Sequence, residues 1–203
     1  MNRIITIGRE FGSGGRELGK RIAENLGVAY YDWEIVTAIA EKSELAVDYV
    51  NQVLEKRIRA YYPITVGHSL SAAHGDALSA VTRSVYTAQT EVLREMAQKS
   101  DCVIVGRCAD KVLEDMKPLR IFVYADMSSR IARCRAMGEH GDAKDDKALA
   151  RRIREVDKAR AQYYHFYTGR PWADRYNYDL LVNTSGIKIP ELAKLICANV
   201  RCR

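Results

Sequence analysis

The segment from Ile4 to Gly27 limits the possible folds more than any other part of the chain. A hydrophobic run there leads into a glycine-rich turn, which reads FGSGG, and the turn leads into an amphipathic stretch. Apolar residues in that stretch recur at four-residue intervals, which is typical of one face of a helix, and Gly27 supplies a helix stop. A strand, a tight turn and a helix in this order open an α/β unit.

The turn has the composition of a phosphate-binding loop. Three glycines within four residues can adopt a positive φ and turn backbone N–H groups inward, and the helix that begins near Arg16 adds its positive end. In the usual pattern, a lysine for the β- and γ-phosphates and a Ser or Thr hydroxyl for Mg²⁺ follow the last glycine. Here Gly15 stands at the lysine position and Arg16 at the next one, and the carboxylate of Glu17 cannot replace the hydroxyl in kind.

Two interpretations of the turn remain. In one, it is a strand-to-helix turn that binds no ligand. In the other, it binds the phosphates of a nucleotide, and Arg16 supplies the charge as a planar guanidinium instead of an ammonium group. Three glycines and two nearby arginines, Arg9 and Arg16, are more than a turn requires, which favours the second interpretation. The candidate nucleotide-binding residues are then Gly12, Ser13, Gly14, Gly15, Arg16 and Glu17.

The rest of the chain alternates strand-like and helical stretches. Several of the strand-like runs are continuous in Val and Ile, which is typical of parallel strands buried on both faces. The five predicted strands are Arg3–Ile7, Val28–Tyr31, Cys102–Val105, Arg120–Tyr124 and Tyr178–Val182. An apolar stripe from Ile189 to Val200 predicts a last helix. The pattern predicts a three-layer α/β domain whose ligand lies beyond the carboxyl ends of the strands.

Two segments are not needed for the sheet. Residues 33–100 are mostly helical in pattern and long for one crossover, so we expect an inserted helical region. Residues 138–170 open with GEHGDAKDDK, a polar hinge that contains glycine, and continue as a highly charged helix, which is the composition of a mobile lid. With 203 residues, the chain is long enough for one domain, 1–203, that carries both segments.

Charge and composition narrow the class of partner. The net charge is +6, from 32 basic and 26 acidic residues, which fits an anionic ligand such as a nucleotide. No basic run with interleaved aromatic residues marks a nucleic-acid surface, so nucleic acid is not an expected partner. The long helices predicted between residues 43 and 100 would suit a homodimer interface, although no pattern specifies one.

We expect a cytoplasmic protein without a membrane partner. No apolar run approaches the roughly 20 residues that cross a bilayer, and the first residues lack the pattern of a signal peptide. The five cysteines form no CxxC pair, which argues against a disulfide framework or a zinc site.

With these elements in order, the chain resembles the cytidylate kinase-like family, P-loop proteins related to bacterial cytidylate kinases and other nucleoside monophosphate kinases. The resemblance covers nearly the whole chain. It is carried by ITIGREFGSGGRELGKRIAENLGVAYYD, VIVGRCAD, RIFVYADMSSRIARC and RIREVDKARAQYYHFYTGRPWADRYNYDLLVNTSG. It implies a P-loop NTPase fold with a five-stranded parallel sheet, an inserted helical monophosphate-binding region and a helical lid. It also implies an enzyme that uses ATP and Mg²⁺ to phosphorylate a nucleoside monophosphate such as CMP.

The resemblance assigns catalytic roles to several side chains. Arg107 falls on an arginine that contacts the substrate monophosphate. Arg154, Asp157 and Arg160 match the lid helix, whose arginines close over the transferring phosphoryl group. Arg154 and Asp157 are three residues apart and share a helix face, so the spacing suggests that they pair. Arg16 joins this catalytic set through its place in the loop.

Three further residues are candidates for the acceptor site. Asp32 ends the second strand and either contacts the substrate or a metal-bound water, or caps the helix that begins at Trp33. Arg83 lies in a long predicted helix and either reaches the acceptor phosphate or is a solvated helix residue. Asp110 and Asp32 are alternative carboxylates for the metal, whose ligands the sequence leaves unassigned.

The departures from the family pattern leave two alternatives open. The aspartates expected before Gly106 and after Arg107 are Val105 and Cys108 here. Altered contacts at these positions suggest a kinase whose acceptor is a small molecule other than a nucleotide. The missing lysine suggests a nucleotide- or phosphate-binding module without catalysis.

Overall fold

Five parallel strands form one sheet in the order β2-β3-β1-β4-β5. The computed structural model describes residues 2–200 except 46, 48–71, 140, 142 and 144. Each predicted strand is confirmed to within two residues at either end. The strands are β1 (Ile4–Arg9), β2 (Ala29–Tyr31), β3 (Cys102–Val105), β4 (Leu119–Tyr124) and β5 (Leu180–Asn183).

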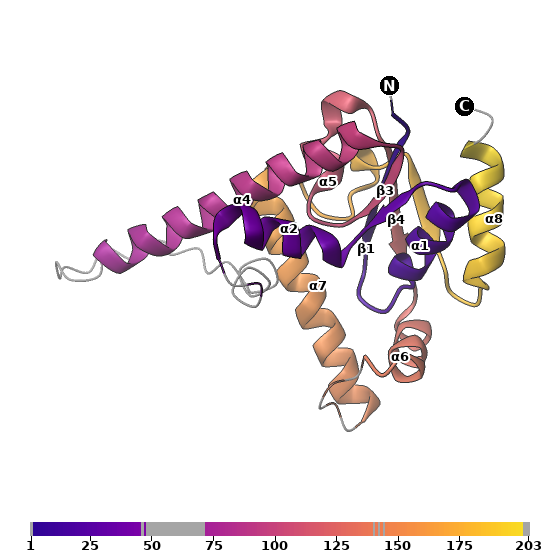
Figure 1. The fold of residues 1–203 in the computed structure, drawn as a ribbon. Helices are drawn as coiled ribbons and strands as arrows, with labels where there is room; N and C mark the ends of the chain where they lie inside the picture. The colour runs from indigo at the N-terminus through magenta and orange to yellow at the C-terminus, as the bar shows by residue number, and fades with distance from the viewer. Residues whose placement is uncertain are drawn as a thin grey trace.

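Helices cover both faces of this sheet (Figure 1). The helices α1 and α8 lie side by side on one face, and α2, α4, α5 and α7 lie on the other. The described helices are α1 (Gly15–Leu26), α2 (Trp33–Ser43), α4 (Ala72–Lys99), α5 (Ala109–Val112), α6 (Met127–Ala136), α7 (Asp146–Thr168) and α8 (Ile189–Val200). The predicted three-layer α/β fold is therefore confirmed.

Alternate side chains of the central strands belong to two separate apolar cores, one on each face of the sheet. In β3, Val103 and Val105 pack with the residues of α1 and α8, whereas Cys102 and Ile104 pack with those of α2 and α4. All four are fully buried. Successive side chains of a strand point to opposite faces, so a strand between two helical layers must be apolar at every position. This explains why the strands read as continuous apolar runs.

The two extra segments are described only in part. The helices α2 and α4 occupy the described parts of 33–100, and α4 extends well past the edge of the sheet (Figure 1). Residues 46 and 48–71 of the expected helical insertion lie outside the described residues. In the 138–170 segment, α7 begins near α6 and runs back toward the sheet, and its action as a lid stays a prediction. Within the described residues, no helix combines the length and apolar character that crossing a bilayer requires.

Candidate phosphate-binding site

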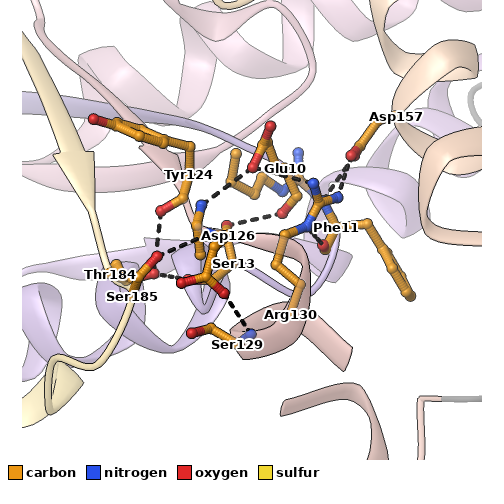
Figure 2. Close-up of polar contacts among 12 residues, drawn as sticks. Glu10, Phe11, Ser13, Tyr124, Asp126, Ser129, Arg130, Asp157, Thr184 and Ser185 are labelled. Carbon is orange, nitrogen blue, oxygen red and sulfur yellow. Dashed lines mark hydrogen bonds and ion pairs between the residues drawn. The ribbon is translucent and has the colours of Figure 1, made fainter. Parts of the chain in front are cut away.

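The loop between β1 and α1 is shaped by two glycines and by hydrogen bonds from distant residues. Gly12 and Gly14 have φ values of 75° and 81°. The Ser13 hydroxyl donates to the Glu10 carbonyl over 2.8 Å, and the Thr184 hydroxyl, which follows β5, donates to the Ser13 carbonyl over 2.6 Å (Figure 2). Ser13 and Thr184 are fully buried. The edge of the sheet therefore fixes the loop.

Main-chain donors gather where α1 begins. Its first i→i−4 hydrogen bond runs from the Leu18 N–H to the Gly14 carbonyl over 2.9 Å. The preceding N–H groups, of Gly15, Arg16 and Glu17, therefore make no intrahelical bond. Orphan N–H groups at the positive end of a helix suit a phosphate group.

Four arginines gather beside this loop, and we call Arg9, Arg16, Arg107 and Arg160 the arginine cluster. The carboxylate of Asp32 offsets part of their charge: the Arg16 Nε lies 2.6 Å from Asp32 Oδ2, and the Arg9 Nη2 lies 3.9 Å from Asp32 Oδ1. The four guanidinium groups outnumber the carboxylates that pair with them, Asp32 and Glu139, which lies 3.5 Å from Arg16 Nη1. Such a concentration favours a polyanion.

Burial and the surrounding positive charge both lower the pKa of Arg9. Burial first, and then the charges of Arg160, Arg107 and Arg16, together lower the pKa to about 9, and Asp32 only partly opposes them. The Arg9 side chain is 14% exposed. Because a bound anion stabilises the charged form of a nearby base, this guanidinium would gain from a phosphate ligand.

Asp32 contacts the arginine cluster and does not act as a helix cap. It stands at the N-cap position of α2, but its side chain makes no capping hydrogen bond. Its carboxylate binds Arg16 instead, and the residue is 8% exposed. The capping interpretation is therefore wrong, because the guanidinium groups at the carboxyl edge of the sheet hold the carboxylate.

Arg107 sits in a strained turn directly after β3. Gly106, Arg107 and Cys108 have φ values of 78°, 58° and 53°. The left-handed conformation costs a non-glycine residue about 1–3 kcal/mol. The buried amide of Gln89 donates to the Arg107 carbonyl over 2.9 Å, and the Tyr163 hydroxyl donates to the same amide over 2.9 Å. These hydrogen bonds fix the turn that presents the Arg107 side chain.

Helix α7 contacts the loop through Asp157 and Arg160. The Phe11 N–H donates to Asp157 Oδ1 over 2.8 Å. Arg160 Nη1 lies 3.4 Å from the Arg9 carbonyl, and its guanidinium carbon lies 5.5 Å from the centre of the Phe11 ring. Two of the three predicted lid residues therefore face the loop, whereas Arg154 is exposed.

Arg130 of α6 links the loop to α7, and sequence reasoning missed it. Figure 2 shows its guanidinium between the two segments: it pairs with Asp157, lies 3.2 Å from Glu10 Oε2 and donates to the Phe11 carbonyl over 2.7 Å. The suggested partner of Asp157, Arg154, is therefore wrong. Arg130 is 119 residues from Phe11 in the chain, so no local pattern reveals this contact.

The remaining candidates lie outside the cluster. Glu17 pairs with Arg21 along α1, at 2.7 Å. The Asp110 carboxylate accepts a hydrogen bond of 2.6 Å from the Tyr164 hydroxyl, and burial raises the pKa of Asp110. Arg83 is exposed on α4.

The donors available for a metal ion are few. Among the described residues, no group of three or more His, Cys, Asp and Glu side chains could hold a metal. The carboxylates beside the loop are paired, Asp32 with Arg16 and both Glu10 and Asp157 with Arg130. A Mg²⁺ ion fits this set only if phosphate oxygens and water supply most of its ligands, which is how Mg²⁺ is commonly held at nucleotide sites.

Comparisons with known proteins agree with this architecture. The model of the cytidylate kinase-like family matches residues 4–186. An uncharacterised protein from Eubacterium ventriosum is 23% identical over 99% of both chains, with a TM-score of 0.68. The shikimate kinase from Bacteroides thetaiotaomicron is 17% identical over 99% of both chains, with a TM-score of 0.57.

A second shikimate kinase, from Acinetobacter baumannii and in complex with shikimate, is 15% identical over 100% of this chain and 94% of its own, with a TM-score of 0.55. None of the curated proteins matches. The solved structures show the P-loop NTPase fold. The family model spans the sheet, the loop and α7, and we conclude that this chain belongs to the cytidylate kinase-like family.

Proposed function

We propose that the chain transfers the γ-phosphoryl group of ATP to a nucleoside monophosphate, with CMP as the first acceptor to test. The observation that carries this proposal is the arginine cluster, which places four guanidinium groups and one carboxylate beside the main-chain donors of α1. A triphosphate and a monophosphate together bring the negative charge that the cluster needs. Family membership supports the same reaction class.

In this proposal the donor and acceptor lie on either side of the cluster. Residues 12–17 bind the triphosphate through main-chain N–H groups, with Arg16 at the rim. Arg107 binds the acceptor phosphate, and Asp32 orients the acceptor or a metal-bound water. Arg160 and Asp157 belong to the lid, residues 138–170, and closure of that lid would bring Arg154 in from its exposed position.

The chemistry requires no nucleophilic side chain. An oxygen of the acceptor phosphate attacks the γ-phosphorus, and the bond from that phosphorus to the β–γ bridging oxygen breaks, so that ADP leaves with the bonding electrons. The guanidinium groups balance charge on the transferring phosphoryl group, which is the main catalytic task in such a reaction. When bound, Mg²⁺ would neutralise phosphate charge, and Asp32 would contact it through a bound water.

The test is ADP release with ATP and a panel of CMP, dCMP, UMP, AMP and GMP. Turnover with one of them, strongest with CMP, is the expected result. If the folded protein turns over none of them, the proposed acceptor class is wrong.

A second acceptor class is favoured by one observation. Val105 and Cys108 replace the aspartates of the family pattern, and both are buried, so these positions offer no charge to a nucleoside. The solved structures that share the fold include kinases named for shikimate. ADP release with a panel of hydroxylated carboxylates, and none with nucleotides, would establish this alternative. Stabilisation by ATP without turnover on either panel would instead indicate a binding module.

A further inference from the structure

We propose that Arg9, the last residue of β1, supplies the fixed positive charge that the loop lysine supplies in the usual phosphate-binding loop. In this role its guanidinium contacts the β- and γ-phosphates of a bound nucleoside triphosphate. The inference rests on the proposed function, because it assumes that such a ligand occupies the loop. It assigns the charge to a residue outside the 12–17 turn.

The spacing of the loop shows an exchange of two residue types. The usual pattern is G-x-x-x-x-G-K, with the lysine directly after the second glycine. With Gly14 as the second glycine, the first-glycine position falls on Arg9 and the lysine position falls on Gly15. The chain therefore carries a long cation where the pattern has glycine, and glycine where the pattern has a long cation.

The structure gives a physical reason for the exchange. A Cβ atom on Gly15 would lie 2.5 Å from Arg9 Cβ, 3.0 Å from Arg9 Cγ and 3.3 Å from Val123 Cβ. Gly15 does not have a positive φ, so its backbone conformation does not require glycine. The Arg9 stem fills the space in which a lysine side chain at position 15 would begin.

The guanidinium group of Arg9 is packed as closely as its Cβ and Cγ atoms. A Cβ atom on Gly106 would lie 1.9 Å from Arg9 Nη1, so the guanidinium rests directly on this glycine. Gly106 directly follows β3 and precedes Arg107. Arg9 therefore reaches from the end of β1 to the end of β3, between the start of α1 and the turn that carries Arg107. A guanidinium there lies between the proposed donor and acceptor sites.

Arg16 is less suited to this role. Its side chain is 55% exposed, and its charge is shared between Asp32, at 2.6 Å, and Glu139, at 3.5 Å. Arg9 is 14% exposed, and its described ionic partner, Asp32, lies 3.9 Å away, beyond the distance of a good hydrogen bond. Burial, the main cause, and the neighbouring arginines lower the pKa of Arg9, which agrees with a guanidinium held inside the cluster.

The test measures binding of a non-hydrolysable ATP analogue by calorimetry, with and without Mg²⁺, for the whole chain and four variants. Arg9→Gln keeps most of the side-chain length and removes the charge. We expect affinity to fall about 10- to 100-fold, as for loss of a charge-assisted hydrogen bond. The melting temperature should stay the same or rise, which a merely structural arginine would not allow.

Arg3→Gln is the matched control, since Arg3 precedes the same strand at the opposite edge of the sheet. The affinity of this variant for the ATP analogue should not change.

The reciprocal pair tests the exchange itself. Gly15→Lys alone should lower the melting temperature, because the new side chain collides with Arg9. Arg9→Gly with Gly15→Lys removes the collision and restores the usual pattern, so we expect most of the affinity and the melting temperature to return.

Three results would distinguish a wrong role for Arg9 from a wrong proposed function. Wild-type affinity in Arg9→Gln would overturn the role of Arg9 and leave the proposed function standing. A double variant that binds as weakly as Arg9→Gln would also overturn it, provided that circular dichroism shows a folded protein. A wild-type protein that binds no analogue would instead refute the proposed function, and the role of Arg9 with it.

Discussion

The carboxylate of Asp32 lies between Arg16 and Arg9 at the carboxyl edge of the sheet. Asp32→Asn removes this negative charge and leaves the arginine cluster with more repulsion. We expect the free energy of unfolding to fall by about 1–2 kcal/mol, a modest loss because Arg16 is more than half exposed. Urea denaturation measures the change.

A surface pair provides the control for this prediction. Asp115→Asn removes a carboxylate that pairs with Arg94 at 3.0 Å, with both side chains exposed. Its cost should be less than about 1 kcal/mol. Equal losses in the two variants would show that Asp32 is no more than another surface charge.

Arg107 combines backbone strain with a proposed role in binding. Arg107→Ala and Arg107→Gly both remove the guanidinium, so both should lower turnover by at least about 100-fold, as expected for loss of a charged phosphate contact. They differ in the backbone, because only glycine adopts a φ of 58° without strain. Arg107→Gly should therefore be more stable than Arg107→Ala by about 1 kcal/mol in thermal or urea unfolding. Equal stabilities would show that the turn is not strained.

At the scale of elements, α6, α7 and the loop after β1 are joined through one buried side chain. Arg130 is 5% exposed and contacts Asp157, Glu10 and Phe11. Arg130→Met keeps much of the volume but leaves two carboxylates unpaired. We expect a loss of about 3 kcal/mol in the free energy of unfolding and faster hydrogen exchange in α7.

The same helix offers a matched control. Arg135→Met removes an arginine that is one-third exposed and that donates to the Ala143 carbonyl over 3.0 Å. Its cost should stay below about 1 kcal/mol. Similar losses in both variants, or unchanged exchange in α7, would contradict the role of Arg130 as a link between the elements.

The elements were predictable because their signals are local. The continuous apolar runs gave all five strands, and Gly27 ends α1 with a φ of 66°, as expected. The site was predictable only in part. Arg16, Asp32 and Arg107 follow directly from their places at strand and helix ends, whereas the contacts of Arg9 and Arg130 depend on residues about 100 positions away. The partner of Asp157 was wrong for the same reason, because helix spacing shows only neighbours on the helix.

At the scale of the whole molecule, a partly buried carboxyl makes stability depend on pH. Asp110 is a residue of α5 that faces α7, where Tyr164 donates to it, and Arg120 is a nearby positive charge. Burial raises its pKa above the ordinary value of 3.8. The unfolded chain therefore ionises more readily than the native protein, and this group costs stability progressively as the pH rises above 3.8.

Asp110→Asn removes the ionisation and keeps an oxygen and a polar group of similar size. Its melting temperature should exceed that of the wild type at pH 7, and the difference should shrink toward pH 4. Melting curves between pH 3.5 and pH 8 test this directly. A difference that does not vary with pH, or that grows at low pH, would contradict the raised pKa.

The mutual fit of Arg9 and Gly15 also restricts how such a loop can change over generations. A lineage that acquired the lysine first would carry two colliding side chains, and one that lost the arginine first would have neither cation. If the two residues are replaced one at a time, each route passes through a variant that is less stable or that binds phosphate less well. Replacing one of the two residues is therefore unfavourable unless the other also changes. Descendants of a protein with Arg9 and Gly15, or of one with glycine and lysine at these positions, would tend to keep the pair that they inherited.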